Sequence, residues 1–114
     1  PDRANYDTTK VRSTSTVGCF PGGASVYGCQ DMSGNVWEWT RSCWGDYPYP
    51  DPGAEREDRE DLTGGDNRLR VLRGGSFYYS HKLARCAYRN KGNPNSRYRF
   101  NGFRLVASPF HSDP

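Results

Sequence analysis

The hydrophobic residues of this chain fall in short clusters, and no long stretch has helical periodicity. The clearest pattern covers residues 36–40, where apolar and polar side chains alternate. Alternation with a period of two predicts a strand. Trp37 and Trp39 would lie on one face of this strand, and Val36 and Glu38 on the other.

Weaker patterns predict the remaining elements. Further strands are expected at residues 70–73, 86–89 and 103–107, and one helical turn at residues 81–85. The segments at 43–66 and 90–101 are expected to be loops, because Pro, Gly and Asn favour turns. Thirteen Gly and eight Pro agree with a loop-rich fold that has little helix.

Composition limits the size and character of the core. A chain of 114 residues is one small domain at most. Only 33% of the residues are hydrophobic, but 14% are aromatic. Each aromatic side chain buries about 150–250 Å². The core is therefore expected to be built from aromatic rather than aliphatic residues.

The net charge of +3 conceals an uneven distribution. Acidic residues dominate residues 45–66, whereas residues 67–110 contain no acid and many arginines. One interpretation is a nucleic-acid surface. The favoured interpretation is that the arginines pair with carboxylates or carbonyls when the chain folds, and nucleic acid is not the expected partner.

The cysteines and the absence of apolar runs bear on location. Cys19, Cys29, Cys43 and Cys86 form no Cys-x-x-Cys pair, which argues against a structural zinc site. No apolar run is long enough to span a membrane, and no targeting signal is present. The default expectation is a cytoplasmic protein with reduced thiols, one or two disulfides remaining open. A chain without an initiator Met indicates a fragment or a processed product.

Few residues are suited to catalysis. His81 and His111 are the only histidines, and neither lies near a recognisable nucleophile motif. Residues 74–76 read Gly-Gly-Ser but lack the spacing and lysine of a phosphate-binding loop. Asp31 and Glu38 flank a glycine turn that could serve a calcium ion, although carboxylates that cap amides or pair with arginine explain that turn at least as well.

A group of aromatic and small polar residues is better suited to binding. Tyr78 and Tyr79 precede a serine, and Tyr98 and Phe100 alternate with arginines in an Asn-rich segment. Rigid aromatic rings supply contact area at low entropic cost, and small polar residues supply adaptable hydrogen bonds. The alternatives are that these aromatics are core residues, or that they stack on single-stranded nucleic acid.

Four motifs together resemble a known family. Residues 31–40, 70–77, 85–90 and 101–106 read DMSGNVWEWT, RVLRGGSF, RCAYRN and NGFRLV. They resemble the C-terminal part of the formylglycine-generating enzyme (sulfatase-modifying factor) domain. The resemblance implies an α+β, C-type lectin-like fold that is loop-rich with short antiparallel strands. It also implies that residues 1–114 are the C-terminal portion of one such domain, with the N-terminal portion supplied by its own longer chain or another chain.

The resemblance argues against catalysis. The family's enzymes use a cysteine pair shortly after the Gly-Gly-Ser motif, where this chain reads FYYSHKLA. Tyr79 stands near the first expected cysteine, and Cys86 matches a downstream, non-catalytic one. Related iron-dependent sulfoxide synthases take histidine ligands from another domain. The expectation is therefore a protein that is not an enzyme and has no catalytic residue.

A closer resemblance is to the variable proteins of diversity-generating retroelements, which use this fold as a ligand-binding scaffold. There the C-terminal stretch is rewritten by adenine-directed mutagenesis, and here that variable region would be about residues 77–101. The implied function is binding of an unknown protein or other macromolecule. The implied ligand-binding residues are outcomes that such mutagenesis produces: Tyr78, Tyr79, Ser80, His81, Gly92, Ser96, Tyr98 and Phe100.

Two further implications of the resemblance remain open. The enzyme family binds calcium near the motif at residues 31–40, which implies a Ca²⁺ site formed by Asp31, Gly34, Val36 and Glu38. The other open point is function, since a non-diversified sensor module of a bacterial signalling protein would share the fold. In either case Trp37, Trp39, Phe103 and Leu105 are expected to support the scaffold.

Overall fold

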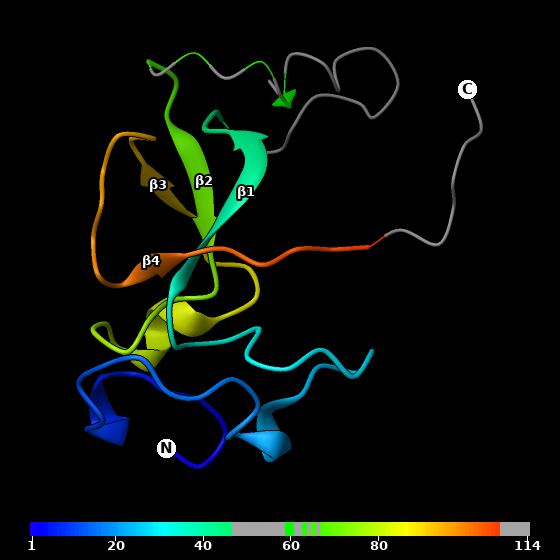
Figure 1. The fold of residues 1–114 in the computed structure, drawn as a ribbon, viewed down its shortest axis with the longest axis vertical. Helices are drawn as coiled ribbons and strands as arrows, with labels where there is room; N and C mark the ends of the chain where they lie inside the picture. Colours follow the sequence, from blue (N-terminus) through cyan, green and yellow to red (C-terminus); the bar gives the residue numbers. More distant parts are fainter. Residues whose placement is uncertain (47–58, 61–62, 64, 66, 108–114) are drawn as a thin grey trace.

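A small mixed β-sheet forms the centre of the fold. The computed structural model describes residues 1–46, 59–60, 63, 65 and 67–107. Its strands are β1 (Trp37–Cys43), β2 (Arg70–Arg73), β3 (Asn90–Gly92) and β4 (Asn101–Gly102), in the order β3-β2-β1-β4. Figure 1 shows β1 and β2 at the middle of this sheet, with the N-terminal third of the chain gathered below it.

The expected α+β class needs correction. Among the described residues the named helical elements are three 3₁₀ turns, η1 (Asp7–Thr9), η2 (Pro21–Gly23) and η3 (His81–Ala84), and Arg59 alone is α-helical. Closely spaced glycines and prolines explain this, since both residues weaken helices. The expectation of antiparallel strands holds for β1-β2 and β2-β3, but β4 pairs with β1 in parallel.

The predicted strand positions were right in the middle of the sheet and wrong at its edges. Strand β2 matches the prediction, and β1 covers residues 37–40 of its predicted range and continues to Cys43. The strand predicted at 86–89 is found later in the chain, at β3. The guanidinium of Arg73 donates hydrogen bonds to the carbonyls of Cys86 and Tyr88, and these carbonyls therefore do not pair in the sheet.

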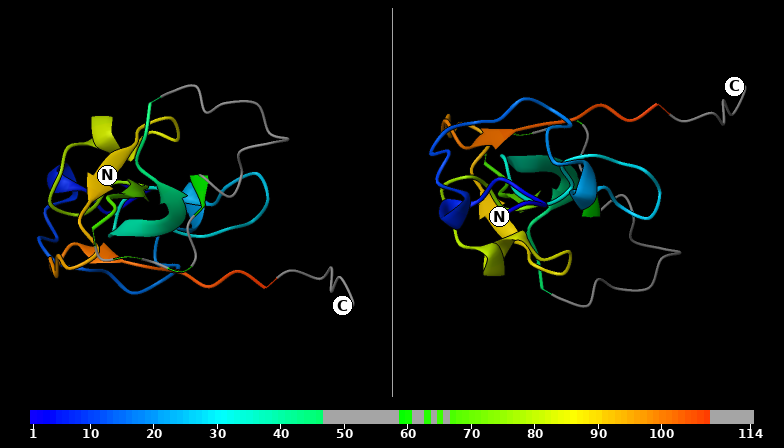
Figure 2. Two further views of the ribbon diagram at one scale, coloured as in Figure 1. Left: turned by 90° about the horizontal axis from the view of Figure 1, so that it is seen from above. Right: turned by 90° about the horizontal axis from the view of Figure 1, so that it is seen from below.

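The closing strand was predicted at residues 103–107 but pairs only at β4. Arg104 donates hydrogen bonds to Gln30, Asp31 and Glu38, and the segment after β4 runs away from the body of the molecule (Figures 1 and 2). The side chains of Phe103 and Leu105 are 73% and 89% exposed. They were expected to support the scaffold, and in the described part of the chain they do not.

The buried core is small and centred on β1 and β2. Trp37 is fully buried, and Val71, Leu72, Phe77 and Cys43 are nearly so. Trp39 is half-buried. The alternation along β1 is confirmed on its other face, because Val36 and Glu38 line the same pocket. The prediction of an aromatic core is therefore confirmed in part, since Trp37 and Phe77 share it with aliphatic residues.

An asparagine pair ties the N-terminal segment to the sheet. Asn5 is buried, and its amide nitrogen donates to the carbonyl of Ser13 at 2.8 Å. The backbone N–H of Asn35 donates to the Asn5 carbonyl at 2.7 Å. Gly34, with a φ of +81°, lets this contact form, because a Cβ there would lie 2.4 Å from the Asn5 oxygen. The polar N-terminal segment is thus part of the framework.

The arginines of the basic segment serve mainly as structural donors, as the favoured interpretation predicted. Arg70, Arg73, Arg85 and Arg89 each donate a side-chain hydrogen bond to a backbone carbonyl. Arg104 binds two carbonyls and a carboxylate. The thiols of Cys19, Cys29, Cys43 and Cys86 are free in the structure. Within the described residues, no helix has the length and hydropathy of a membrane span.

Candidate functional site

Four aromatic side chains from two separate segments form one cluster. Tyr78 and Tyr79 follow β2, and Tyr98 and Phe100 precede β4. The ring of Phe100 stacks between Tyr78 and Tyr98, with centroid distances of 5.5 and 5.1 Å. Tyr79 meets Tyr78 and Phe100 edge-on at 5.3 and 5.4 Å. We call these four residues the aromatic cluster, and Tyr78, Phe100 and Tyr98 its three-ring stack.

Backbone hydrogen bonds hold both segments of the cluster on the sheet. The N–H of Phe77 donates to the carbonyl of Asn35 at 2.9 Å, and the N–H of Trp37 donates to the carbonyl of Phe100 at 2.8 Å. The first bond involves the turn before β1, and the second involves the first residue of β1. The two aromatic segments are therefore fixed against the same end of β1, although about twenty residues separate them in sequence.

The cluster runs from the core to the surface. Tyr79 contacts the buried ring of Trp37 edge-on at 6.0 Å. Tyr79 and Phe100 are half-buried, whereas Tyr78 and Tyr98 are each 57% exposed. Tyr79 and Phe100 therefore belong partly to the core, and Tyr78 and Tyr98 present most of the free aromatic surface.

A pocket lies at each end of the three-ring stack. One, of about 280 Å³, is lined by Tyr78 and by residues from three segments: Asp7, Arg12, Phe77 and Arg99. The other, of about 300 Å³, is lined by Tyr98, Phe100 and Tyr79 together with Leu72 and residues of β3 and β4: Asn90, Lys91, Gly92 and Asn101. An aromatic ridge between two pockets of mixed polar and apolar lining can contact a partner over a broad area.

The other predicted ligand-binding residues lie apart from the rings. His81 is exposed on η3, and its ring contacts the Tyr6 ring at a centroid distance of 6.1 Å. Ser80 and Ser96 are half-buried and line neither pocket of the cluster. The structure therefore brings together four of the eight predicted residues as touching rings.

Gly92 does not fit the role of a replaceable contact. It lines the second pocket, but a Cβ on it would lie 2.7 Å from the Trp39 ring and 3.0 Å from a methyl group of Leu72. A side chain at residue 92 would therefore pack against Trp39 and Leu72. Ligand contact through Gly92 stays a prediction.

Two residues of the cluster's surroundings escaped the sequence analysis. Arg12 and Arg99 line the first pocket, and neither guanidinium has a hydrogen-bond partner among the residues that the structure describes. Residue 12 lies in a polar segment without periodicity. Only the folded arrangement of η1 against Tyr79, whose carbonyl accepts from the N–H of Asp7 at 3.1 Å, brings it near residue 99.

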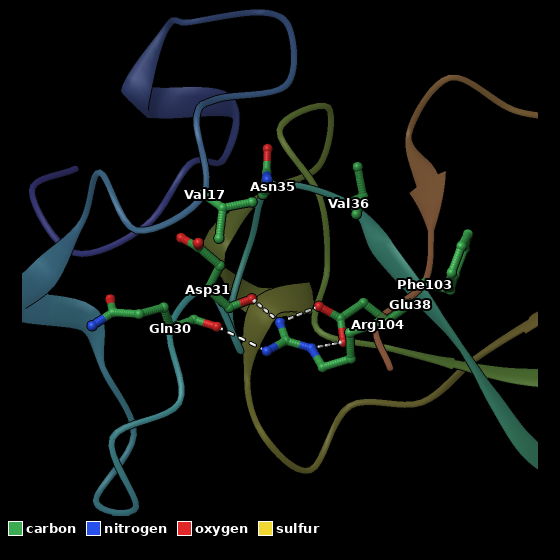
Figure 3. A pocket seen from close by; sticks show the side chains of 8 residues that line it. All are labelled: Val17, Gln30, Asp31, Asn35, Val36, Glu38, Phe103 and Arg104. Carbon is green, nitrogen blue, oxygen red and sulfur yellow. Dashed lines mark hydrogen bonds and ion pairs between the residues drawn. The ribbon is translucent and has the colours of Figure 1, made fainter. Parts of the chain in front are cut away.

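The residues predicted to bind calcium surround an arginine. Arg104 donates to the carbonyls of Gln30 and Asp31 at 2.9 and 3.0 Å, and to the carboxylate of Glu38 at 2.6 Å (Figure 3). A second guanidinium nitrogen binds the other Glu38 oxygen. The hydrogen bonds that Arg104 donates to the Glu38 carboxylate raise the pKa of Arg104 above its ordinary value. The positive charge at this point is therefore supplied by the chain itself.

The predicted calcium ligands do not fit an ion in this arrangement. Both oxygens of Glu38 are used by Arg104, and Asp31 accepts from the N–H of Gly18 at 2.7 Å. Gly34 packs against Asn5 and does not line this pocket. Throughout the described residues, no three His, Cys, Asp or Glu side chains gather as metal ligands do. Calcium binding stays a prediction that a titration can test.

Comparison with known families places this fold. The sequence profile of the sulfatase-modifying factor enzyme 1-like domain matches residues 3–109. The chain belongs to this family. The four motifs that suggested the family fall inside the matched range, so the resemblance drawn from them is confirmed, and the fold is that of the formylglycine-generating enzyme-like domain.

Individual relatives of this family member differ in function. Over 100 residues the chain is 42% identical to a hercynine oxygenase of Mycolicibacterium smegmatis. This alignment covers 84% of this chain and 23% of the oxygenase. It is 36% identical over 104 residues to a serine/threonine-protein kinase, pkn1, of Chlamydia pneumoniae, covering 91% of this chain and 16% of the kinase. The chain spans less than a quarter of either protein.

A solved structure agrees with the proposed scaffold. Treponema denticola variable protein 1 superposes with a TM-score of 0.71 and 29% identity, covering 90% of this chain and 34% of that protein. The fold is therefore shared by proteins with oxygenase, kinase and variable-protein names. Which of these activities, if any, belongs to this chain has to be argued from the site.

Proposed function

We propose that this domain is a ligand-binding scaffold of C-type lectin type, and that it belongs to a variable protein diversified by a retroelement. The observation that carries the proposal is the aromatic cluster. Two segments far apart in sequence are anchored to one end of β1 and place four aromatic rings together. The exposed rings, Tyr78 and Tyr98, are suited to contact a macromolecule.

Three features support binding rather than catalysis as the function of this site. The exposed aromatic surface rests on a fixed sheet, as recognition surfaces do. The similar solved structure is named a variable protein. The residues between Ser76 and Arg85 contain no cysteine. The ligand that best fits such a surface is a protein or another macromolecule, because the pockets beside the rings are open rather than deep.

A library experiment tests the scaffold. Codons for Tyr78, Ser80, Ser96 and Tyr98 would be randomised to NNY, and the displayed 114-residue domain selected against a panel of purified proteins. We expect most clones to stay resistant to protease and binders to emerge, since these side chains are not needed for the core. A matched library at the inward-facing residues Trp37, Leu72, Ser76 and Phe77 should lose most folded clones.

Two outcomes would contradict the scaffold. One is equal loss of folding in both libraries, which would make the cluster's outer residues part of the core. The other is a well-folded first library that yields no binders against any protein of the panel.

A second candidate is a non-diversified sensor module of a signalling protein. The match to a kinase over 91% of this chain favours it. The neighbouring DNA separates the two candidates. A near-copy of the coding sequence for residues 70–106 that differs only at adenines, beside a reverse transcriptase gene, is expected for a variable protein. A locus with neither would favour the sensor module.

A further inference from the structure

The charge around the aromatic cluster is one-sided. Arg12 and Arg99 line the pocket at the Tyr78 end of the three-ring stack. Lys91 lines the other pocket, but its ammonium lies over the Trp44 ring, 5.7 Å from the centroid. Residues 67–110 contain no acid that could neutralise Arg99 from within its own segment. The partner of this surface should therefore carry negative charge.

The two arginines are available to a partner. Most arginines of the basic segment are used by backbone carbonyls, whereas the guanidiniums of Arg12 and Arg99 have no hydrogen-bond partner among the described residues. The guanidinium of Arg99 lies 5.8 Å from the centroid of the Phe77 ring, which holds it at the pocket wall. A guanidinium with free N–H groups favours bidentate contact with a carboxylate.

One carboxylate, that of Asp7, shares this pocket. It accepts hydrogen bonds from the backbone N–H of Thr8 at 2.6 Å and from the Thr8 hydroxyl at 3.2 Å. Its charge is partly compensated by these donors and does not pair with either arginine within the described structure. Two guanidiniums against one carboxylate leave the pocket positive.

The geometry of the rings argues against a nucleic acid as the partner. Proteins that bind single strands offer free aromatic faces on which bases stack. Here both faces of Phe100 are covered by Tyr78 and Tyr98, and Tyr79 presents its edge. The cluster thus offers mainly ring edges and the two outer faces, which suit aliphatic and aromatic side chains of a peptide.

We propose that the aromatic cluster recognises an acidic protein segment, whose carboxylates bind Arg12 and Arg99 at the Tyr78 end of the stack. This rests on the proposed binding function and adds the chemistry of the partner. The ring centroids step by 5.5 and 5.1 Å along the stack. An extended chain rises about 3.3 Å per residue, so roughly three further residues of the partner would span the rings.

The test is a selection of random twelve-residue peptides on the folded 114-residue domain. We expect selected peptides to gain Asp and Glu over Lys and Arg, with apolar residues beside the acids. The strongest peptide should bind about fivefold more weakly to the variant that carries both Arg12→Gln and Arg99→Gln, which corresponds to about 1 kcal/mol for the two exposed ion pairs together. A variant with Lys10→Gln and Arg97→Gln loses the same charge outside both pockets and should bind within about twofold of the wild type.

Several outcomes would overturn the acidic partner. One is a selection without acidic enrichment or without any binding peptide, and another is an equal loss in the two double variants. A third is an oligo-dT strand that binds more tightly than the peptide and weakens in the Arg12 and Arg99 variant, which would assign the surface to nucleic acid. If the NNY library still yields protein binders in any of these cases, the proposed binding function is retained and only the proposal of an acidic partner is rejected.

Discussion

At the scale of single residues, Arg104 decides how one end of the molecule is held together. Its guanidinium joins Gln30 and Asp31, which precede β1, to Glu38 within β1. Each nitrogen of this guanidinium donates a hydrogen bond to an oxygen atom. The oxygen atoms for which a calcium ion was predicted are thus bound by the positive charge of Arg104.

Replacing Arg104 by Ala should lower the free energy of unfolding by about 1–2 kcal/mol, because hydrogen bonds to charged groups are lost from a partly exposed pair. Urea denaturation would measure the change, and Arg97→Ala provides the control. The raised pKa of Arg104 means that this contribution is present at neutral pH and is lost only as the pH rises through that raised value. An Arg104→Ala protein as stable as the control would contradict the structural role.

Calcium provides a separate test of the same corner. Since Arg104 uses both oxygens of Glu38, adding millimolar Ca²⁺ to the wild-type chain should leave its Tm unchanged. Differential scanning fluorimetry with and without EDTA would measure this. A rise in Tm that Mg²⁺ does not reproduce would show that calcium displaces the arginine or binds elsewhere.

Gly92 offers a second test at this scale. A side chain there would meet Trp39 and Leu72, so Gly92→Ser should destabilise the fold by about 1–3 kcal/mol through overpacking. Lys91→Ser, on the exposed neighbouring residue of β3, is the matched control. Equal stability of the two variants in urea would restore Gly92 to the replaceable surface.

At the scale of the elements, the aromatic cluster contains two kinds of residue that look alike in the sequence. Tyr78 and Tyr98 are mostly exposed, and Tyr79 and Phe100 are wedged between them and the core. Replacing Tyr78 and Tyr98 by Ala should leave Tm nearly unchanged. Replacing Tyr79 and Phe100 by Ala should lower Tm by several degrees, since the loss of packed aromatic area costs about 2–4 kcal/mol.

Thermal denaturation of the two double variants would measure this difference. It would divide the four aromatics, which the sequence predicted as ligand-binding residues, into surface and core members. If both pairs lower Tm equally, the exposed rings are also part of the core, and the proposed recognition surface shrinks accordingly.

The elements also show what could be predicted from the sequence. Alternation located β1, and the short apolar pair Val71-Leu72 located β2, because both strands are buried and their side chains follow the period of a sheet. The edge strands β3 and β4 were misplaced. Their positions depend on which backbone carbonyls accept hydrogen bonds from Arg73 and Arg104, which are distant in sequence. Such contacts leave no local pattern in the sequence.

The same limit applies to the candidate site. The aromatic residues could be found from composition and spacing, and the structure brings them together. The partnership of Arg12 with Arg99 could not, because it arises from the packing of η1 against the carbonyl of Tyr79. A backbone contact made by an aperiodic segment leaves little signal in a single sequence.

At the scale of the whole molecule, one side of the sheet carries apolar residues that nothing described here covers. Phe103, Leu105 and Val106 follow β4, and their side chains are 73%, 89% and 86% exposed. The sheet ends at β4 within the described residues, so the backbone beyond it is a free edge. Free apolar edges attract further strands. We propose that additional protein, from the same longer domain or another chain, covers this segment.

The 114-residue chain alone is therefore expected to self-associate as its concentration rises, and lysines in place of Leu105 and Val106 should reduce this association. Sedimentation velocity over a hundredfold concentration range would measure it. Val26 and Tyr27 provide the control, because they are as exposed but lie on the loop between η2 and β1 and not in the segment after β4. If lysines at Val26 and Tyr27 suppress association equally, the attraction is general hydrophobicity. If the wild-type chain stays monomeric throughout, the segment after β4 needs no cover, and the apolar side chains there must serve a purpose other than assembly.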